Sequence, residues 1–499
     1  MTRLLRSLWG WITGRTAPAA APAESERHTA PPAQPGPPLS PPASAGAPAE
    51  SEKPSPAPTK PSRPAFPPLP RGERTIIVGV DFGTSSTKVI WQDLSDNHFE
   101  IFRWGATGTG LPALLLSSAI VIRGSAIHFG VPDGDVREGD IRLTSVKLCV
   151  LCRSNPSICS CGSSVARHGM VRLPGQETAY PASTFACLFL AHVFHEVEHR
   201  LMGQFPNDDL LLLWNIGCPM DYLDEAGRKG EWERMAGVAM DLHGGVSNPA
   251  SVSPLAEVTA RLASFAVPAP GARNYFVQPE GLAAVKAFLE SPHAESKTYA
   301  IVDVGAGTTE VSFFFNGRIM TERGQPLRPS YLADSTQPVG GGRIDLELAQ
   351  AWNCGAEQAR RRKEAGEAKL PIGRSMSEIC VQYERTCREI VKCHKLTAAG
   401  DKQFDLFVIG GGGRLRPLQE ALRSRPLPGG FVRDGWRQLQ PPRSLNGRLA
   451  ILGDYDFLAN ACGLASSLSW EYYPPREVPP MPPPSPPKPR PDLDEYYPK

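Results

Sequence analysis

The chain contains 499 residues, too many for one ordinary hydrophobic core, so at least two folded lobes are expected. Its 53 basic and 51 acidic side chains leave a net charge near zero, which excludes a general electrostatic attraction to nucleic acid. Eleven cysteines in a long sequence without a secretory signal predict reduced thiols and a cytoplasmic protein.

The first 15 residues, MTRLLRSLWGWITGR, have an amphipathic pattern at helical spacing. Leucine, tryptophan and isoleucine side chains share one arc, Arg3 and Arg6 share the other, and the stretch has no acidic residue. We expect a basic helix that docks on a membrane surface through Trp9 and Trp11, or on a partner protein. A disordered start and an arginine-rich targeting peptide are the alternatives. No apolar run approaches the roughly 20 residues that cross a bilayer.

Prolines are concentrated at both ends of the chain: 18 of the 52 precede Arg74 and 12 follow Tyr472. These segments have too few large apolar side chains to offset the entropy lost on ordering. We therefore expect a disordered linker over 16–73 and a disordered tail over 473–499. The PxxP patterns of the tail suit polyproline recognition, and a plain spacer is the alternative.

The stretch IIVGVDFGTSSTKVIW, residues 76–91, predicts two strands joined by a tight glycine turn. An acid, Asp81, closes the first strand. Backbone amides freed by glycine can approach phosphate oxygens, and hydroxyls add further donors. The candidate phosphate-binding residues of this turn are Gly83, Thr84, Ser85, Ser86 and Lys88.

A second stretch, KTYAIVDVGAGTTEVSFFFNG, repeats this arrangement 222 positions later, with Asp303 in place of Asp81. Its candidate phosphate-binding residues are Gly305, Ala306, Gly307 and Thr308. Carboxylates suit a magnesium ion that keeps its water shell. We therefore expect Asp81 and Asp303 to hold Mg²⁺ through water. Two copies of a turn that is common singly indicate a duplicated, functional motif.

A third glycine-rich segment, FDLFVIGGGGRLRPLQEAL, predicts a strand that ends at Ile409 and a helix that follows Arg414. Backbone without side chains at Gly410, Gly411 and Gly412 would admit a flat ring. The guanidinium of Arg414 can stack on such a ring.

In this order, the three segments resemble the phosphate-1, phosphate-2 and adenosine motifs of the actin, sugar-kinase and heat-shock-chaperone ATPase superfamily. The resemblance is strongest to the nucleotide-binding domain of the seventy-kilodalton heat-shock chaperones and covers roughly 75–470. It implies an α/β, two-lobed actin-like ATPase fold, in which duplicated ribonuclease-H-like lobes enclose a nucleotide cleft. Lobe I would span 74–296 with a small insert about 105–180, and lobe II 297–472 with a helical subdomain about 346–402.

The resemblance also implies individual roles. Lys147 would take the catalytic lysine position near the γ-phosphate, and Gln278 would orient the attacking water, with Glu257 as the alternative if the alignment slips. Gly340 and Gly341 would pass near the phosphates. In RRRKEAGEAKLPI, Lys369 is the expected basic contact to the nucleoside, although the spacing leaves Lys363, Glu364 and Glu367 open as well.

The implied activity is binding of ATP and ADP with Mg²⁺ and slow hydrolysis, with lobe closure acting on an unknown partner protein. Asp81, Lys147, Gln278 and Asp303 would be its catalytic residues. Fewer than 30 residues follow 472, so we expect no peptide-binding domain of the chaperone type. The alternatives are an actin-like filament subunit at the inner membrane face, a small-molecule kinase, and a nucleotide-binding scaffold without catalysis.

Four cysteines follow Lys147 closely, in CVLCRSNPSICSCG. Two close thiol pairs can form a tetrahedral zinc site, and a set of reduced or redox-active cysteines is the alternative. The candidate ligands for Zn²⁺ are Cys149, Cys152, Cys159 and Cys161.

Overall fold

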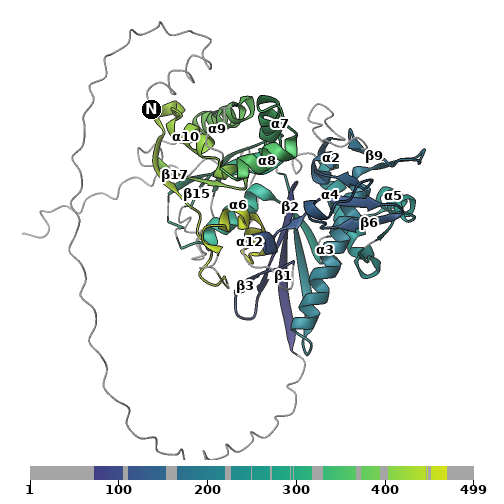
Figure 1. The fold of residues 1–499 in the computed structure, drawn as a ribbon. Coiled ribbons are helices and arrows are strands. Elements are labelled where there is room, and N and C mark those ends of the chain that lie inside the picture. The colour runs from purple at the N-terminus through teal and green to yellow at the C-terminus, as the bar shows by residue number, and fades with distance from the viewer. Residues whose placement is uncertain are drawn as a thin grey trace, which may run out of the picture. The chain divides into compact units, whose positions relative to one another are not determined.

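The computed structural model describes residues 72–104, 111–152, 166–219, 226–248, 250–269, 272–292, 294–295, 297–316, 330–366, 373–393, 403–445, 447 and 451–468. These residues belong to one compact unit, Pro68–Lys499. The unit is a mixed α/β structure with several sheets and helices (Figure 1). The helix expected over 1–15, the tail expected over 473–499 and most of the linker expected over 16–73 fall outside the described residues. The linker prediction extended too far by at least one residue, because Glu73 already belongs to strand β1 (Glu73–Phe82).

The first large sheet is built around the acid-glycine segment that begins at residue 76. Its central strand pairs in parallel with β11 and antiparallel with β2. The strands, in spatial order, are β13 (Tyr275–Pro279), β11 (Asp209–Cys218), β1 (Glu73–Phe82), β2 (Ser86–Asp93) and β3 (His98–Ile101), with β4 (Leu116–Ser117) also pairing with β2. Asp81 is thus the next-to-last residue of β1.

The second large sheet repeats the order and the directions of the first. Its central strand pairs in parallel with β17 and antiparallel with β15. In matching order the strands are β18 (Val432–Arg437), β17 (Gln403–Ile409), β14 (Thr298–Val304), β15 (Thr309–Phe315) and β16 (Ser330–Gln337). Asp303 is the next-to-last residue of β14, so the duplication seen in the sequence extends to whole sheets.

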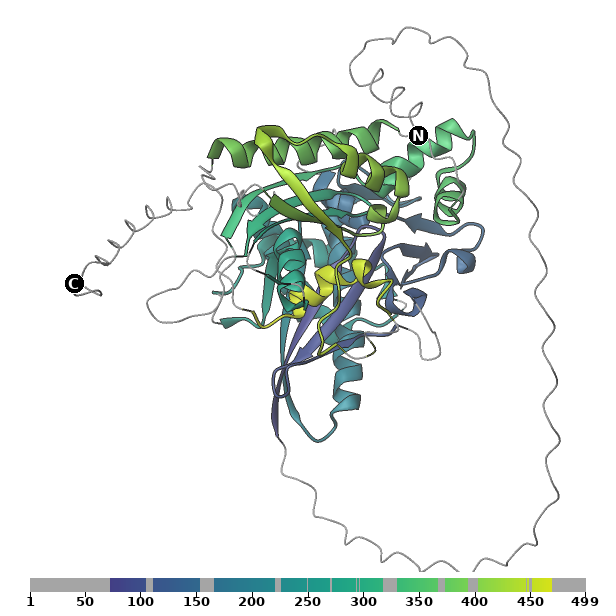
Figure 2. The same cartoon turned by 90° about the vertical axis from the view of Figure 1, so that its left-hand side faces the viewer.

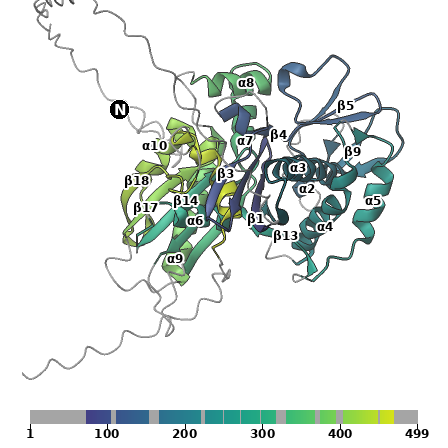
Figure 3. The same cartoon turned by 90° about the horizontal axis from the view of Figure 1, so that it is seen from below.

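Helices pack on each large sheet, and the buried side chains between helices and sheet form the hydrophobic core. Figure 3 places α2, α3, α4 and α5 on one side of β1, and α6, α9 and α10 on the other. The helices of the first half are α2 (Val146–Cys152), α3 (Ala182–Gln204), α4 (Ala226–Leu242), α5 (Leu255–Ser264) and α6 (Glu280–Glu290). Those of the second half are α7 (Gly341–Ala351), α8 (Ala356–Glu364), α9 (Arg374–Cys393), α10 (Arg416–Ser424) and α12 (Ala459–Ala465).

Two short sheets lie within the first half, between β4 and α5. One has the order β12 (Ala250–Ser251), β6 (Ala126–Phe129), β5 (Ile120–Arg123) and β7 (Ile141–Leu143). The other has the order β10 (Ala179–Pro181), β9 (Met170–Arg172) and β8 (Ala166–Arg167). Helix α2 follows β7 and carries Lys147.

The helix that follows each large sheet packs on the other sheet. Helix α6 follows β13 yet contacts β14 and β15, and α12 follows β18 yet contacts β1, β2 and β11. Figure 2 shows the yellow α12 beside the purple strands of the first sheet. The two helices cross where Gly463 meets the carbonyl of Ala283, so closely that a Cβ at 463 would overlap that oxygen. Gly79 of β1 is likewise covered by the backbone of α12 at Ala461 and Ala465.

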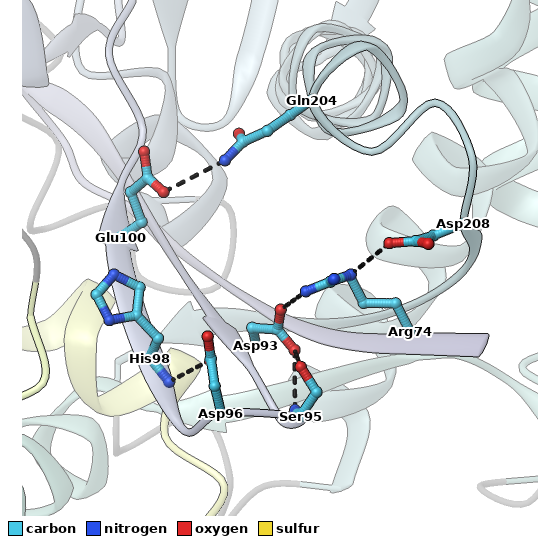
Figure 4. Close-up of polar contacts among 8 residues, drawn as sticks. All are labelled: Arg74, Asp93, Ser95, Asp96, His98, Glu100, Gln204 and Asp208. Atoms are coloured by element: carbon cyan, nitrogen blue, oxygen red, sulfur yellow. Dashed lines mark hydrogen bonds and ion pairs between the residues drawn. The ribbon is translucent and has the colours of Figure 1, made fainter. Parts of the chain in front are cut away.

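An arginine anchors the start of β1 (Figure 4). The Nε atom of Arg74 donates to Asp208 Oδ2 at 2.7 Å, and its Nη1 pairs with Asp93 at the end of β2. Its guanidinium also lies 4.4 Å from the centre of the Phe205 ring. These contacts hold together the open end of the β1–β2 hairpin. The opposite end of the hairpin carries the glycine turn that follows Asp81.

None of the helices within the described residues combines the length and the apolar composition needed to cross a membrane.

Candidate functional site

The first hairpin brings an acid and a lysine together. Asp81 on β1 and Lys88 on β2 are direct cross-strand partners, and Lys88 Nζ lies 3.0 Å from Asp81 Oδ2. The N–H of Gly83 donates to the carbonyl of Asp81 at 3.0 Å. A Cβ at Gly83 would overlap the carbonyl oxygen of Ser86, so the turn can form only with glycine there.

The second hairpin has the same strand pairing as the first but a negatively charged residue in place of the lysine. Glu310 takes the position opposite Asp303 that Lys88 takes opposite Asp81. Asp303 Oδ2 instead accepts a hydrogen bond from Asn460 Nδ2 of α12, at 2.7 Å. Burial raises the pKa of Asp303, the Asn460 hydrogen bond opposes this shift, and the charge of Asp81 reinforces it.

The two turns meet. A Cβ at Gly307 would lie 2.6 Å from the hydroxyl oxygen of Thr84, so the backbone of the second turn lies against the side chain of the first. Thr84 and Gly307 are buried, Ser86 and Thr308 are partly exposed, and Ser85 is exposed. The structure therefore brings together the residues that the sequence assigned to two separate phosphate-binding turns.

A glycine turn before α7 braces the second hairpin. The N–H of Gly341 donates to the carbonyl of Gly305, and the N–H of Gly342 donates to that of Ala306, both at 2.8 Å. A Cβ at Gly340 would lie 2.6 Å from the Gly305 oxygen. Gly340 and Gly341 thus lie against the second turn, and the N–H groups of Gly341 and Gly342 are used within the protein. That Gly340 and Gly341 pass near phosphates stays a prediction.

Lys147 of α2 forms a buried ion pair with Glu280, the first residue of α6. The two residues are 2% and 6% exposed. Burial lowers the pKa of Lys147, but the carboxylates of Glu280 and Asp81 outweigh it, so the pKa is raised. Burial raises the pKa of Glu280, and the attraction of Lys147 acts against that shift. Lys147 thus lies in the same charged centre as Glu280 and Asp81, while its role near a γ-phosphate stays a prediction.

Local backbone makes room for this pair. Ser145, two residues before Lys147, has a φ of 58°, a left-handed value that non-glycine residues rarely adopt. A Cβ at Gly217 of β11 would lie 3.2 Å from the Glu280 carboxylate oxygen. The left-handed backbone at Ser145 and the missing side chain at Gly217 therefore leave space for Lys147 and Glu280 to pair.

Gln278 does not join this centre. Its Oε1 accepts a hydrogen bond from Lys286 Nζ at 3.3 Å, on a buried lysine of α6. Glu257, the alternative, is an exposed residue of α5 that pairs with Arg261 at 2.6 Å. The polar group that reaches Lys147 is Glu280, two residues after Gln278. Glu280 could not be identified from the sequence, because the chain turns from β13 into α6 between Pro279 and Glu280, which changes the direction of the side chains.

The third glycine segment lies beside Asp303. Gly410 has a φ of 78°, and a Cβ there would overlap Oδ1 of Asp303. A Cβ at Gly411 would lie 3.0 Å from the ring of Phe457, and Gly412 packs on Val304. The bare backbone of this turn thus packs closely against one carboxylate oxygen of Asp303, which is a buried residue.

Arg414 extends from this turn over an aromatic ring. Its guanidinium carbon lies 4.3 Å from the centre of the Phe457 ring, and Nη2 lies 2.9 Å from Asp454 Oδ1. Next to the ring, burial raises the pKa of Asp456 to about 6, and the backbone oxygen of Asp456 accepts from the N–H of Gly410. Phe457 was not predicted from the sequence, although an aromatic residue facing an arginine is a recognisable stacking partner.

Several predicted residues lie outside what the structure describes. Lys369 and Glu367 are among them, as are Cys159 and Cys161. Cys149 is buried in the core of the first half. In the described part of the chain, no three histidine, cysteine, aspartate or glutamate side chains gather closely enough to ligate a metal ion directly.

No protein-family model matches the sequence, and a search of curated proteins returns no match. The geometry itself defines a mixed α/β protein in which two sheets of equal order bring two acid-glycine hairpins into contact. Around that contact lie four carboxylates and two ammonium groups: Asp81, Glu280, Asp303, Glu310, Lys88 and Lys147. Such a centre can bind an anionic chain through backbone and ammonium donors and can accept a hydrated cation.

Proposed function

We propose that this chain binds ATP and ADP with magnesium and hydrolyses ATP slowly, as an actin-like ATPase closest to the seventy-kilodalton heat-shock chaperones. The observation that carries the proposal is the repeated sheet order, with an acid at the same position of each central strand and the two following turns in contact. A nucleotide would bind with its phosphates at that contact and its nucleoside near Arg414.

The hairpins supply the phosphate contacts. The N–H groups of Gly83 and Gly305 are used within their own turns, so the hydroxyls of Thr84, Ser85 and Thr308 are the donors that would surround the phosphates. Lys88 and Lys147 bring positive charge into a buried setting, where each charge counts for more than it does in water. Lys88 balances Asp81 directly, which leaves the second hairpin as the more negative of the two.

The side chains fit a hydrated magnesium ion. This centre holds four carboxylates and two lysines. Burial raises the pKa of both Asp303 and Glu280, and the charge of Asp81 raises both further, so an added cation would relieve that repulsion. Asp81 and Asp303 would hold it through water, and it would neutralise charge on the phosphates.

Glu280 is the group we propose as the base that receives a proton from the attacking water. A carboxylate can accept that proton, whereas the amide of Gln278 cannot. In the structure Glu280 is paired with Lys147, so the pair must open before Lys147 can turn to a phosphate. This requirement favours slow hydrolysis.

Helices α6 and α12 would couple nucleotide binding to the binding of a partner protein. Helix α6 packs on the second large sheet and α12 packs on the first. A rotation of one sheet relative to the other must therefore change how α6 and α12 cross at Gly463. We propose that closure around nucleotide changes this crossing and so regulates a partner protein. Attachment through residues 1–15 to the inner face of a membrane is part of this proposal and concerns residues outside the described ones.

The substitution Asp303→Asn tests the proposal. It keeps the shape of the side chain and removes its charge, so we expect phosphate release from ATP to fall at least about 100-fold. Steady-state phosphate release by the intact chain, with magnesium in excess, is the measurement. Glu257→Gln is the matched control, since Glu257 is an exposed carboxylate of α5 and should leave the rate unchanged. Equal rates for Asp303→Asn and the unaltered chain would refute the assignment.

A further inference from the structure

Helix α3 carries two histidines one helical turn apart near its C-terminal end. The stretch HEVEH places His195 and His199 at positions i and i+4, with Glu196 and Glu198 between them. A helix presents two imidazoles to one zinc ion with this spacing, and the pattern H-E-x-x-H is the form in which zinc enzymes use it. Three fixed positions are a weak signal by themselves, so the geometry of the two rings decides what the pattern means.

The structure brings the two imidazole rings together at the surface. Their centroids lie 6.2 Å apart, and the angle between their planes is 30°. His195 is partly exposed and His199 is exposed, so an ion can reach both rings from solvent. Two nitrogens bound to a tetrahedral zinc ion lie about 3.4 Å apart at the usual Zn–N distance. Rotation of exposed side chains, which is fast, can bring one nitrogen of each ring to that spacing.

Packing accounts for other polar side chains on the same stretch of α3. His192, one turn earlier, is buried, and its ring stacks on that of Phe129 with 5.0 Å between centroids. The carboxylate of Glu198 lies 2.6 Å from Nε2 of His243, in the short helix that follows α4. The other two histidines of α3 instead lie against each other at the surface.

We propose that His195 and His199 bind a divalent transition-metal ion, Zn²⁺ in the first place, with water in the remaining coordination positions. Imidazole nitrogen suits zinc, copper and nickel, whereas magnesium prefers oxygen ligands. Catalytic zinc sites take three protein ligands, and in the described part of the chain no third histidine, cysteine, aspartate or glutamate converges on this pair. We therefore assign metal binding to the pair, and no hydrolysis.

A bound ion would join two successive turns of α3. The same end of the helix holds the chain after β3 through Arg200, whose guanidinium carbon lies 4.4 Å from the centre of the Phe102 ring. The ion would therefore stabilise a part of α3 that packs on the first half. The inference goes beyond the proposed function and does not depend on it, since the pair shares no residue with the proposed nucleotide site.

The test is a calorimetric titration of Zn²⁺ into the intact chain without nucleotide. We expect the chain to bind one zinc ion more than the double variant His195→Ala, His199→Ala, and each single variant to bind that ion at least about tenfold more weakly. Cysteines elsewhere are the same in all these chains and cancel in the comparison. His98→Ala is the matched control, because His98 is a partly exposed histidine of β3, and it should leave zinc binding unchanged. Titration with Mg²⁺ should not distinguish the intact chain from the double variant.

Replacing one histidine by another zinc ligand makes the test specific for coordination. His199→Cys supplies a thiolate at the same position, so it should keep zinc affinity within about tenfold of the intact chain, while His199→Ala does not. Equal numbers of bound ions and equal affinities in the intact chain and the double variant would overturn the inference, as would a His199→Cys variant that binds zinc no better than His199→Ala. Should the double variant not fold, as judged by circular dichroism, the comparison of these two single variants decides.

Discussion

Replacing Lys147 by methionine is expected to abolish measurable phosphate release and to lower the free energy of unfolding by about 3–5 kcal/mol. The loss of stability arises because Glu280 would remain buried with its main partner removed. The loss of activity arises because no cation would remain between the Glu280 carboxylate and the phosphate chain. Urea unfolding and steady-state phosphate release measure the two effects separately.

A double substitution separates stability from chemistry at this pair. Lys147→Met with Glu280→Leu removes both buried charges, and apolar replacement of a buried ion pair is commonly neutral or stabilising. We therefore expect most of the lost stability to return while phosphate release stays undetectable. If the double variant regained activity together with stability, Lys147 and Glu280 would be structural residues only, and the catalytic role assigned to them would be wrong.

Replacing Gly463 by valine is expected to be the most damaging change away from the charged centre. A side chain at this position would overlap the carbonyl oxygen of Ala283, which is backbone and cannot rotate away. Overpacking at a helix crossing that joins both sheets should cost about 3 kcal/mol or prevent folding. The midpoint of chemical unfolding measures this.

Gly203→Ala is the matched control for that substitution. Gly203 lies near the end of α3 with open space around the position of a Cβ, so alanine should be neutral or stabilise by up to about 1 kcal/mol. An unfolding midpoint for Gly463→Val equal to that of the original chain would mean that α6 and α12 do not cross as closely as described.

The two hairpins could be predicted from the sequence because everything that defines them is local. An apolar run, an acid, a glycine and a second apolar run lie within 16 residues of sequence in each case, and their spacing alone indicates strand, turn and strand. That the sequence contains two copies made a shared site a reasonable expectation. The contact between Gly307 and Thr84 is the structural counterpart of that expectation.

The partners of the site residues could not be predicted in the same way. Lys147 meets Glu280 across 133 positions, and Asn460 meets Asp303 across 157, so these pairs depend on how whole elements pack. Gln278 was chosen by resemblance to a motif, but the strand ends one residue later and the first helical residue points to the centre instead. The spacing of residues in the sequence does not reveal such a change of side-chain direction at a strand–helix junction.

The exchange of α6 and α12 between the sheets was also beyond the sequence. The absence of side chains fixes both contacts of α12, at Gly463 where it crosses α6 and at Gly79 where it packs on β1. A glycine within a helix or strand usually destabilises that element. At Gly79 and Gly463 the reason for glycine becomes evident only from the backbone that packs against each of them in the folded structure.

The most direct test of the account is equilibrium binding of ATP to the intact chain, with and without magnesium. If the two hairpins hold one triphosphate between them, the chain should bind one ATP, at least about tenfold more tightly with magnesium, and Asp303→Asn should lose that dependence on magnesium. No binding of ATP in the presence of magnesium, or an equal affinity for the intact chain and Asp303→Asn under both conditions, would contradict it.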